Sequence, residues 1–309
     1  MAYRFKLSDA SVEAGVRRIA LDQIDKAIAE IDDAEADQHE TVHQFRKRCK
    51  KLRGLIRLVR PAFPAYADEN AAFRDAARTL SPVRDSEALI ETYDALMDRF
   101  DDQVERRAFA SIRRRMTWRQ RDTVRKRDIS EKIEAARDML VAARSRAGDW
   151  RIKDGDFGDT IGAGLAKTYR RARKAMRSAV RSGDPAEFHE WRKRVKYHRY
   201  HTRLLTPMWD GPLEAHRQAA ETLSDILGDH HDLAVLQDVL SHDPEAYGNP
   251  ADVEAMIGLA QRRQETLAAE AGPLGAKLLA EPPDKLARRW QAYWTAWTRQ
   301  RREQRSLAA

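Results

Sequence analysis

The sequence predicts an all-α protein built from two similar helical halves, and three observations carry that prediction. Helix-favouring residues are abundant, whereas the 309-residue chain holds only 14 Gly and 11 Pro. Runs of β-branched residues with period-two alternation, which would indicate strands, are hard to find. A basic helical motif that begins near residue 43 returns near residue 189. That recurrence indicates an internal duplication.

The first half, residues 5–147, is expected to hold six helices. Asp9 or Ser11 can cap the first helix, and an acidic stretch leads into the second. Pro61 and Pro64 end the second helix because proline cannot continue one. The predicted helices cover residues 11–31, 41–60, 68–80, 85–100, 103–118 and 129–147.

Residues 148–160 contain three glycines and several aspartates, which is typical of a linker. The helical order then restarts in a second half, residues 161–303. Its predicted helices cover residues 161–182, 185–205, 213–227, 231–240, 252–271 and 284–302. Because both halves repeat the same motifs, we treat residues 1–309 as one domain with an expected pseudo-twofold axis.

Charge narrows the class of partner. Lys and Arg number 57 against 49 Asp and Glu, for a net charge of +8. Such a surplus favours a polyanion: nucleic acid, an anionic membrane or a phosphate polymer. Cys49 is the only cysteine, so no disulfide or CxxC metal site can form within the chain. No apolar leader or run of about 18–20 apolar residues occurs, so we expect a soluble, cytoplasmic protein that does not use a membrane.

The repeated motif reads VHQFRKRCKKLRGLIRLVRP in the first half and FHEWRKRVKYHRYHTRLLTP in the second. Its polar positions correspond in pairs with a constant spacing and no gap. They are His43, Arg46, Lys47, Lys50, Arg53 and Arg57, matched by His189, Arg192, Lys193, Lys196, Arg199 and Arg203. A second matched segment follows each motif, and it contains Asp85 in the first half and Asp232 in the second.

On a helix at about 100° per residue, the six polar positions of each copy fall within an arc of roughly 120°. Apolar residues occupy the opposite side, together with His198, which we interpret as a core histidine. Like charges three or four residues apart destabilise a helix by roughly 0.2–0.5 kcal/mol per pair. Since no Asp or Glu interrupts either stripe, both stripes predict an external anion.

The length of the stripe favours a linear polymer. From His43 to Arg57 it covers roughly 21 Å, far more than one phosphate needs. Single-strand nucleic-acid binders interleave aromatic residues with basic ones, but Phe45, Phe188 and Trp191 are predicted on the apolar side. A phosphate polymer therefore fits better than nucleic acid, which stays the alternative.

At these residues the sequence resembles the CHAD family, the conserved histidine α-helical domain. The two H-x-x-R-K-x-x-K-x-x-R segments resemble its signature helices, and VRDSEAL and HHDLAVL resemble its RDxxxL junctions. The resemblance implies two helical bundles around a central basic channel, lined by the twelve motif residues. It also implies binding of inorganic polyphosphate, association with polyphosphate granules, and no catalysis. The ExExK signature of a fused triphosphatase is missing, as in stand-alone members.

Other residues complete the hypothesis. Weaker candidates for lining the channel are Arg18, Arg113, Lys167, Arg171 and Lys174. Asp85 and Asp232 are expected to cap helices or pair with the basic helices. The residue before each aspartate differs, Arg84 against His231, so no shared role is expected there. The basic run that begins at Arg113 is interpreted as a solvated surface, and Trp290, Trp294 and Trp297 as core.

An enzyme is the second alternative. Asp225, Asp229, His230, His231 and Asp232 form a dense group of metal-ligand residue types. A metal-dependent polyphosphate hydrolase would use that group. Against this interpretation, the matching segment of the first half has no histidine. No nucleophile elbow, P-loop or dinucleotide fingerprint occurs either, so we expect no catalytic residues, no metal and no cofactor.

Overall fold

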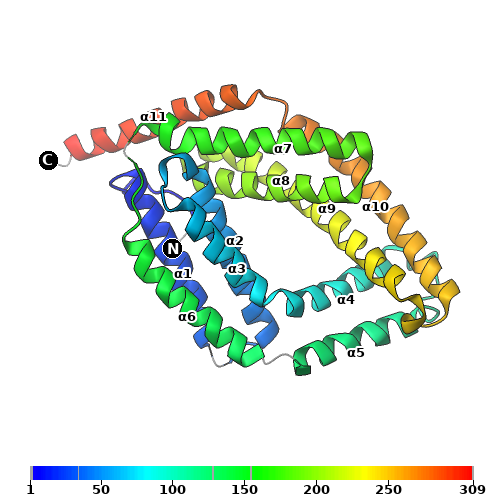
Figure 1. The fold of residues 1–309 in the computed structure, drawn as a ribbon. Coiled ribbons are helices and arrows are strands. Elements are labelled where there is room, and N and C mark those ends of the chain that lie inside the picture. Colours follow the sequence, from blue (N-terminus) through cyan, green and yellow to red (C-terminus); the bar gives the residue numbers. More distant parts are fainter. Residues whose placement is uncertain (1–2, 34, 127–128, 154, 308–309) are drawn as a thin grey trace.

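The computed structural model describes residues 3–33, 35–126, 129–153 and 155–307, and within these ranges it forms helices and no strand. Figure 1 shows the order of the elements along the chain. The helices of the first half are α1 (Val12–Asp32), α2 (Gln38–Leu58), α3 (Tyr66–Thr79), α4 (Ser81–Arg99), α5 (Ala110–Lys126) and α6 (Ile129–Gly148). Those of the second half are α7 (Ala163–Ser182), α8 (Pro185–Leu205), α9 (Asp210–His242), α10 (Pro250–Leu278) and α11 (Pro283–Leu307).

The all-α prediction is confirmed, and α1 and α8 begin within one residue of their predicted starts. Ser11 caps α1 by accepting a hydrogen bond from the backbone N–H of Ala14 at 3.1 Å. Asp184 caps α8 in the same way through the N–H of Ala186, at 2.9 Å. Gly183 ends α7 with φ of 68°, a left-handed conformation that suits glycine. Helix α8 therefore has the predicted bounds.

The prediction of a helix over residues 103–118 is wrong, because α5 begins at Ala110. Residues 101–109 form turns after α4, with the N–H groups of Gln103 and Val104 bonded to the carbonyl of Phe100. Phe109 is buried, and its carbonyl accepts a hydrogen bond from the Tyr93 hydroxyl at 3.0 Å. Tertiary burial of Phe109 thus overrides the local helical pattern.

The predicted break between residues 227 and 231 is also wrong, because α9 runs unbroken from Asp210 to His242. Leu227, Leu233 and Leu236 are all buried along it, so packing maintains the helix through Gly228. A Cβ at Gly228 would lie 3.7 Å from the side chain of Arg192. The glycine therefore sits against α8 and does not end the helix.

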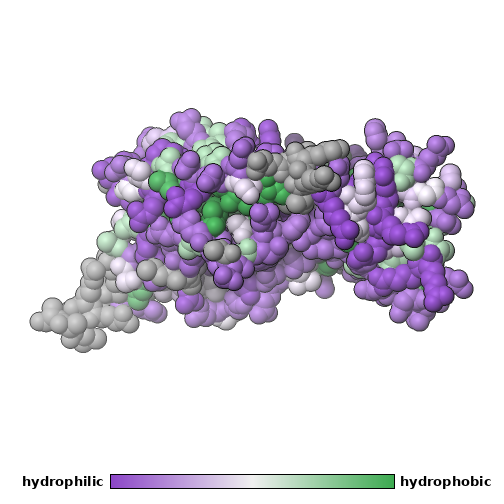
Figure 2. Space-filling view, turned by 90° about the horizontal axis from the view of Figure 1, so that it is seen from below, coloured by the Kyte–Doolittle hydropathy of each residue, from purple (hydrophilic) through white to green (hydrophobic). Residues whose placement is uncertain are grey.

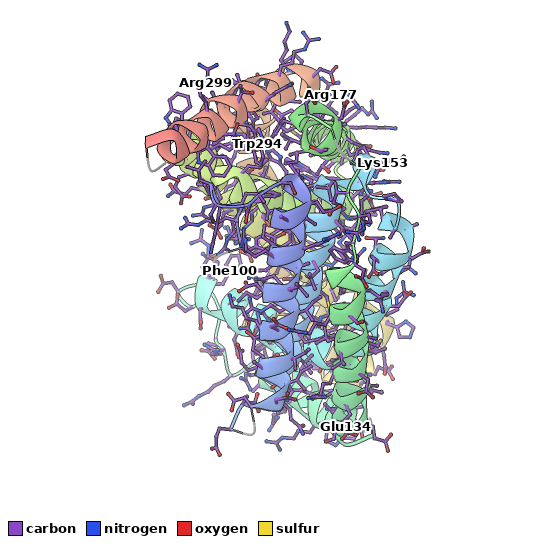
Figure 3. The ribbon with its side chains drawn as sticks, turned by 90° about the vertical axis from the view of Figure 1, so that its left-hand side faces the viewer. Phe100, Glu134, Lys153, Arg177, Trp294 and Arg299 are labelled. Atoms are coloured by element: carbon purple, nitrogen blue, oxygen red, sulfur yellow. The ribbon has the colours of Figure 1, made fainter. Side chains whose placement is uncertain are left out.

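The helices surround the middle of the molecule (Figure 1). Helices α1 and α6 form one side, α7 and α11 another, α9 and α10 a third, and α4 and α5 the fourth. Figure 3 shows α1 beside α6, with Glu134 at the far end of α6 and Arg299 on α11 at the opposite end. This arrangement leaves α2 and α8 inside the perimeter.

The hydrophobic core does not divide at the boundary between the sequence halves. The larger core combines residues of α1, α2 and α6 with residues of α7, α8 and α11. A second core joins α4 and α5 of the first half to α9 and α10 of the second, through residues such as Tyr93, Ile112, Leu236 and Met256. The two halves are therefore packed through each other.

The segment predicted as a linker is packed against the first half. Trp150 and Ile152 are buried. The carbonyl of Trp150 accepts a hydrogen bond from Arg17 Nε at 2.6 Å, and the N–H of Ile152 donates to Glu13 Oε2 at 2.8 Å. A π-helical turn, Gly158–Gly162, then leads into α7. The connection between the halves is thus held at several points.

The face of the molecule that Figure 2 draws is mostly hydrophilic. Figure 2 shows one face covered mainly by hydrophilic residues, with hydrophobic ones in small groups. In the part of the chain that the structure describes, no helix combines the length and the hydropathy that crossing a membrane would require.

Candidate anion-binding site

Helices α2 and α8 cross where Gly54 meets Tyr200. A Cβ at Gly54 would lie 2.9 Å from the ring of Tyr200, so only glycine allows this approach. Gly54 also contacts α8 through its carbonyl, which is 3.1 Å from His201 Nε2. Lys50 and Lys196 each stand one helical turn before this crossing. The crossing therefore brings the central lysines of the two motifs near each other.

Lys50 and Lys196 are half-buried, and no described acidic side chain forms an ion pair with either. Burial, followed by the charges of Arg46 and Arg192, lowers the pKa of Lys50 to about 8. Burial and then the charge of Lys50 lower the pKa of Lys196 to about 7. Both shifts mean that the folded protein disfavours the charged form of these two lysines. An anion bound between the lysines would stabilise the charged form.

Arg46 and Arg192 flank the lysines, and each is close to the aspartate of its own half. Arg46 Nη2 lies 3.8 Å from Asp85 Oδ1, and Arg192 Nη2 lies 3.9 Å from Asp232 Oδ1. Arg46 also donates to the carbonyl of Ala77 at 2.8 Å. Such long ion pairs position the guanidinium groups and neutralise them only in part. We name Arg46, Lys50, Arg192 and Lys196 the crossing cluster.

Pairing was one of two predictions for Asp85 and Asp232, and capping was the other. Capping is wrong, because the N-cap positions of α4 and α9 are Leu80 and Trp209. The residues that precede the two aspartates nevertheless occupy equivalent places in the two halves. The charge of Arg84 acts on His43, and His231 Nδ1 lies 3.0 Å from His189 Nδ1. Position 84 and position 231 therefore both face the motif histidine of their half.

The motif histidines are held in their neutral form. Burial, followed by the charge of Arg84, lowers the pKa of His43. Burial also lowers the pKa of His189, and it brings the pKa of its partner His231 to about 3. A neutral imidazole still has one N–H to donate. His198 is fully buried, as predicted for a core histidine, and it lies 2.8 Å from His216.

Arg53 and Arg57 continue the basic path along α2. Both donate to the neutral side chain of Asn70, at 3.2 and 3.0 Å, so their charges are not cancelled. The guanidinium of Arg57 lies 4.3 Å from the ring of Tyr197 on α8. That contact links the two motif helices a second time.

Lys167 and Arg171 extend this path onto α7. The charge of Arg60 is the first cause of the lowered pKa of Lys167. Burial and then the charges of Arg194 and Arg60 lower the pKa of Arg171. Arg60 and Arg194 were not among the predicted site residues, and Arg60 gave no signal beyond its charge. Arg84 was noted in the repeated segment, but no role was predicted for it, whereas its charge acts on His43.

Other motif cations do not meet at the crossing. Lys193 pairs with Glu190, and Arg199 pairs with Glu221 and, at 3.3 Å, with Asp225. The stripe of the second copy is thus paired with acids from two helices: Glu190 lies on α8 itself, and Glu221 and Asp225 lie on α9. Lys47 and Arg203 are exposed, and their charges act on Lys51.

The weaker candidates divide. Arg18 pairs with Asp9 at 2.6 Å and donates to the carbonyl of Arg4 at 3.0 Å. Arg113 pairs with Asp94 at 2.8 Å on the exposed side of α5. These two side chains are thus engaged in ion pairs with acids outside the crossing cluster. Lys174 is exposed on α7, three residues beyond Arg171.

The Asp/His group on α9 does not come together as one set of ligands. Asp225 contacts Arg199, His230 stacks on Phe188 at 4.3 Å, and His231 contacts His189. Asp229 and Asp232 line a cavity of about 330 Å³ between α4, α9 and α10. Among the described residues, no three potential metal ligands are close enough to hold an ion.

Comparison with known proteins identifies the family. The family model of the CHAD domain matches residues 18–241. The chain belongs to the CHAD domain family. This match includes both motif helices and the junction after each of them.

Two relatives of this CHAD domain come from Mycobacterium tuberculosis. The uncharacterized protein MT2285 of strain CDC 1551 is 26% identical over 271 residues, which cover 82% of this chain and 50% of that protein. The uncharacterized protein Rv2226 of strain H37Rv is 27% identical over the same length and coverage. The chain thus spans about half the length of the curated relatives it matches.

Two solved structures share the fold of this CHAD domain. PptA from Streptomyces chartreusis aligns with a TM-score of 0.59 and 15% identity, covering 86% of this chain and 98% of PptA. The CHAD domain from the plant Ricinus communis aligns with a TM-score of 0.56 and 16% identity, covering 91% and 94%. At such identities the likeness concerns the fold.

Proposed function

We propose that this CHAD domain binds inorganic polyphosphate at the crossing cluster and does not cleave it. The observation that carries the proposal is the approach of Lys50 to Lys196, half-buried and without an acidic partner. Unpartnered buried cations are costly to the folded state. Their presence at equivalent positions of two motifs favours an anionic ligand that completes their surroundings.

A chain of phosphates fits the shape of the basic path better than one phosphate does. The path leads from Lys167 and Arg171 through Arg57 and Arg53 to the crossing cluster. Its cations come from α2, α7 and α8, so a linear ligand would touch all three helices. Arg offers two parallel donors to phosphate oxygens, and Lys offers a point charge.

Nucleic acid fits this path less well. Phe45, Phe188 and Trp191 are buried, and the ring of Tyr197 is covered by Arg57. These aromatic residues of the motif helices are therefore poorly placed to stack on bases. Because we propose polyphosphate as the ligand, we also propose that the domain acts in the cytoplasm, at polyphosphate granules.

The test replaces both central lysines, as Lys50→Glu with Lys196→Glu. We expect at least a hundredfold loss of polyphosphate affinity, measured by calorimetry. Removing one partner of a buried ion pair costs about 3–5 kcal/mol, and the substitutions remove the cationic partners of the phosphates. The matched control is Lys285→Glu with Arg288→Glu, which changes the same charge at exposed positions of α11. Circular dichroism should show unchanged helical content for both variants.

Three outcomes would contradict the proposal. The first is unchanged affinity of the lysine variant, and the second is an equal loss in the control. The third is nucleic acid displacing polyphosphate at matched charge, at a salt concentration held constant. Hydrolysis is tested separately: steady phosphate release with a divalent metal, lost on Asp232→Ala, would favour an enzyme instead.

A further inference from the structure

A second basic surface lies on α5, apart from the crossing cluster. It borders an open hollow of about 760 Å³. The hollow is lined by residues of α4, of the turns before α5, and of α5 itself: Tyr93, Arg106, Arg107, Ala110, Arg113, Arg114, Thr117, Trp118 and Arg121. None of these residues belongs to the motif helices, so the surface is independent of the proposed polyphosphate site.

Two kinds of arginine line this hollow. Arg106 and Arg113 are bound to acids of α4, namely Asp94 and Asp98. Arg107, Arg114 and Arg121 are exposed, and no described side chain pairs with them. They recur every seven residues, and Arg114 and Arg121 therefore share one side of α5. We name Arg107, Arg114 and Arg121 the α5 stripe.

Trp118 stands within the α5 stripe, four residues after Arg114 and three before Arg121. Its side chain is 52% exposed, although Trp is normally among the more buried residues. The guanidinium of Arg115 lies 4.3 Å from the centre of the ring. Trp118 also lines the hollow. An exposed aromatic ring therefore lies among unpaired arginines on this surface.

We propose that the α5 stripe and Trp118 bind a single-stranded polynucleotide. Phosphates of the strand would pair with the three free arginines, and a base would stack on the exposed face of Trp118. Phosphate binding by arginine combined with stacking on an aromatic ring is how single strands are held without reading their sequence. A bare phosphate chain has no base, so it cannot use Trp118. The aromatic ring is what sets this surface apart from the crossing cluster.

The test measures affinity for fluorescently labelled oligo(dT) and oligo(U) with the full chain. Trp118→Ala should weaken binding of both about tenfold, since the substitution removes the ring on which a base would stack. Trp209→Ala is the matched control, because Trp209 is 51% exposed but lies near Tyr293 of α11. Arg114→Glu with Arg121→Glu should also weaken binding and reduce its dependence on salt.

Affinity for polyphosphate distinguishes the α5 stripe from the crossing cluster. Trp118→Ala should leave polyphosphate affinity unchanged, whereas Lys50→Glu with Lys196→Glu should leave oligonucleotide affinity unchanged. Oligonucleotide binding that depends on the arginines but not on Trp118 would overturn the proposal, since the surface would then recognise charge alone. Equal affinity for duplex and single strands would overturn it too. Neither result would bear on the crossing cluster.

Discussion

Lys50 and Lys196 lie at a place where burial and neighbouring cations both favour the neutral amine. The pKa of Lys50 falls to about 8 and that of Lys196 to about 7, from a usual value of 10.5. The unfolded chain would keep both protons up to about pH 10. Between pH 7 and pH 10 the unfolded state thus binds more protons than the folded state, and the free energy of unfolding rises with pH.

This linkage gives a prediction for the ligand-free protein and one for the complex. Chemical denaturation should show the protein gaining stability as pH rises from about 7 to 9, and Lys196→Met should flatten that gain. Polyphosphate requires the charged amines, so its affinity should fall by on the order of a hundredfold or more over the same range. Calorimetry in buffers of different ionisation enthalpy should detect proton uptake on binding. Proton release on binding would contradict this account.

At the scale of elements, the contacts between helices depend on two glycines. A Cβ at Gly54 would lie 2.9 Å from Tyr200, and one at Gly164 of α7 would lie 1.9 Å from the carbonyl of Leu58. The backbone oxygen of Leu58 cannot rotate away as a side chain could. Helix α2 is therefore held between α8 and α7 at a distance that only glycine permits.

Gly164→Ala should lower the free energy of unfolding by about 1–3 kcal/mol, because the added methyl group overpacks the α2–α7 contact. Gly258→Ala on α10 is the control, since a Cβ there meets nothing within 4 Å. The control should gain roughly 0.5–1 kcal/mol, as alanine favours helix more than glycine does. Thermal unfolding would measure both, and equal effects of the two substitutions would refute the close contact.

Local signals explain which elements could be predicted. Helix α8 was placed correctly because Asp184 and Pro185 mark its start and Pro207 follows its end. The start of α5 was missed because burial of Phe109 is a tertiary effect. Periodicity identified the charged face of α8, but it could not reveal that Glu221 of α9 reaches Arg199. A helical pattern in the sequence predicts which residues share a face of one helix. It does not predict which residues of another helix contact that face.

At the scale of the whole molecule, the repeat in the sequence and the packing of the core follow different boundaries. The repeat divides the chain near residue 148, while the second core joins α4 and α5 to α9 and α10. Tyr93 and Ile112 of the first half are buried in the same core as Leu236 and Met256 of the second half. This interlocking could not be seen in the motifs, which repeat within each half.

Fragments ending at residue 148 and beginning at residue 155 should each fail to fold alone, since each would leave its share of the second core open to water. Mixed together, they should recover helical circular dichroism and a cooperative thermal transition. A stable, monomeric first fragment with native-like unfolding would contradict this expectation.

The shared core also limits how the repeated motif could have arisen by duplication. A single ancestral copy of this unit, if it resembled either half, could not have covered its own equivalents of Tyr93 and Leu236. It would have needed a second, identical polypeptide to do so, exchanging arms across a symmetric dimer. Fusion of two such genes would then have replaced a dimer that can dissociate with a single chain. Lys50 and Lys196 would then descend from one lysine, which lay opposite the same lysine of the second polypeptide across the dimer axis.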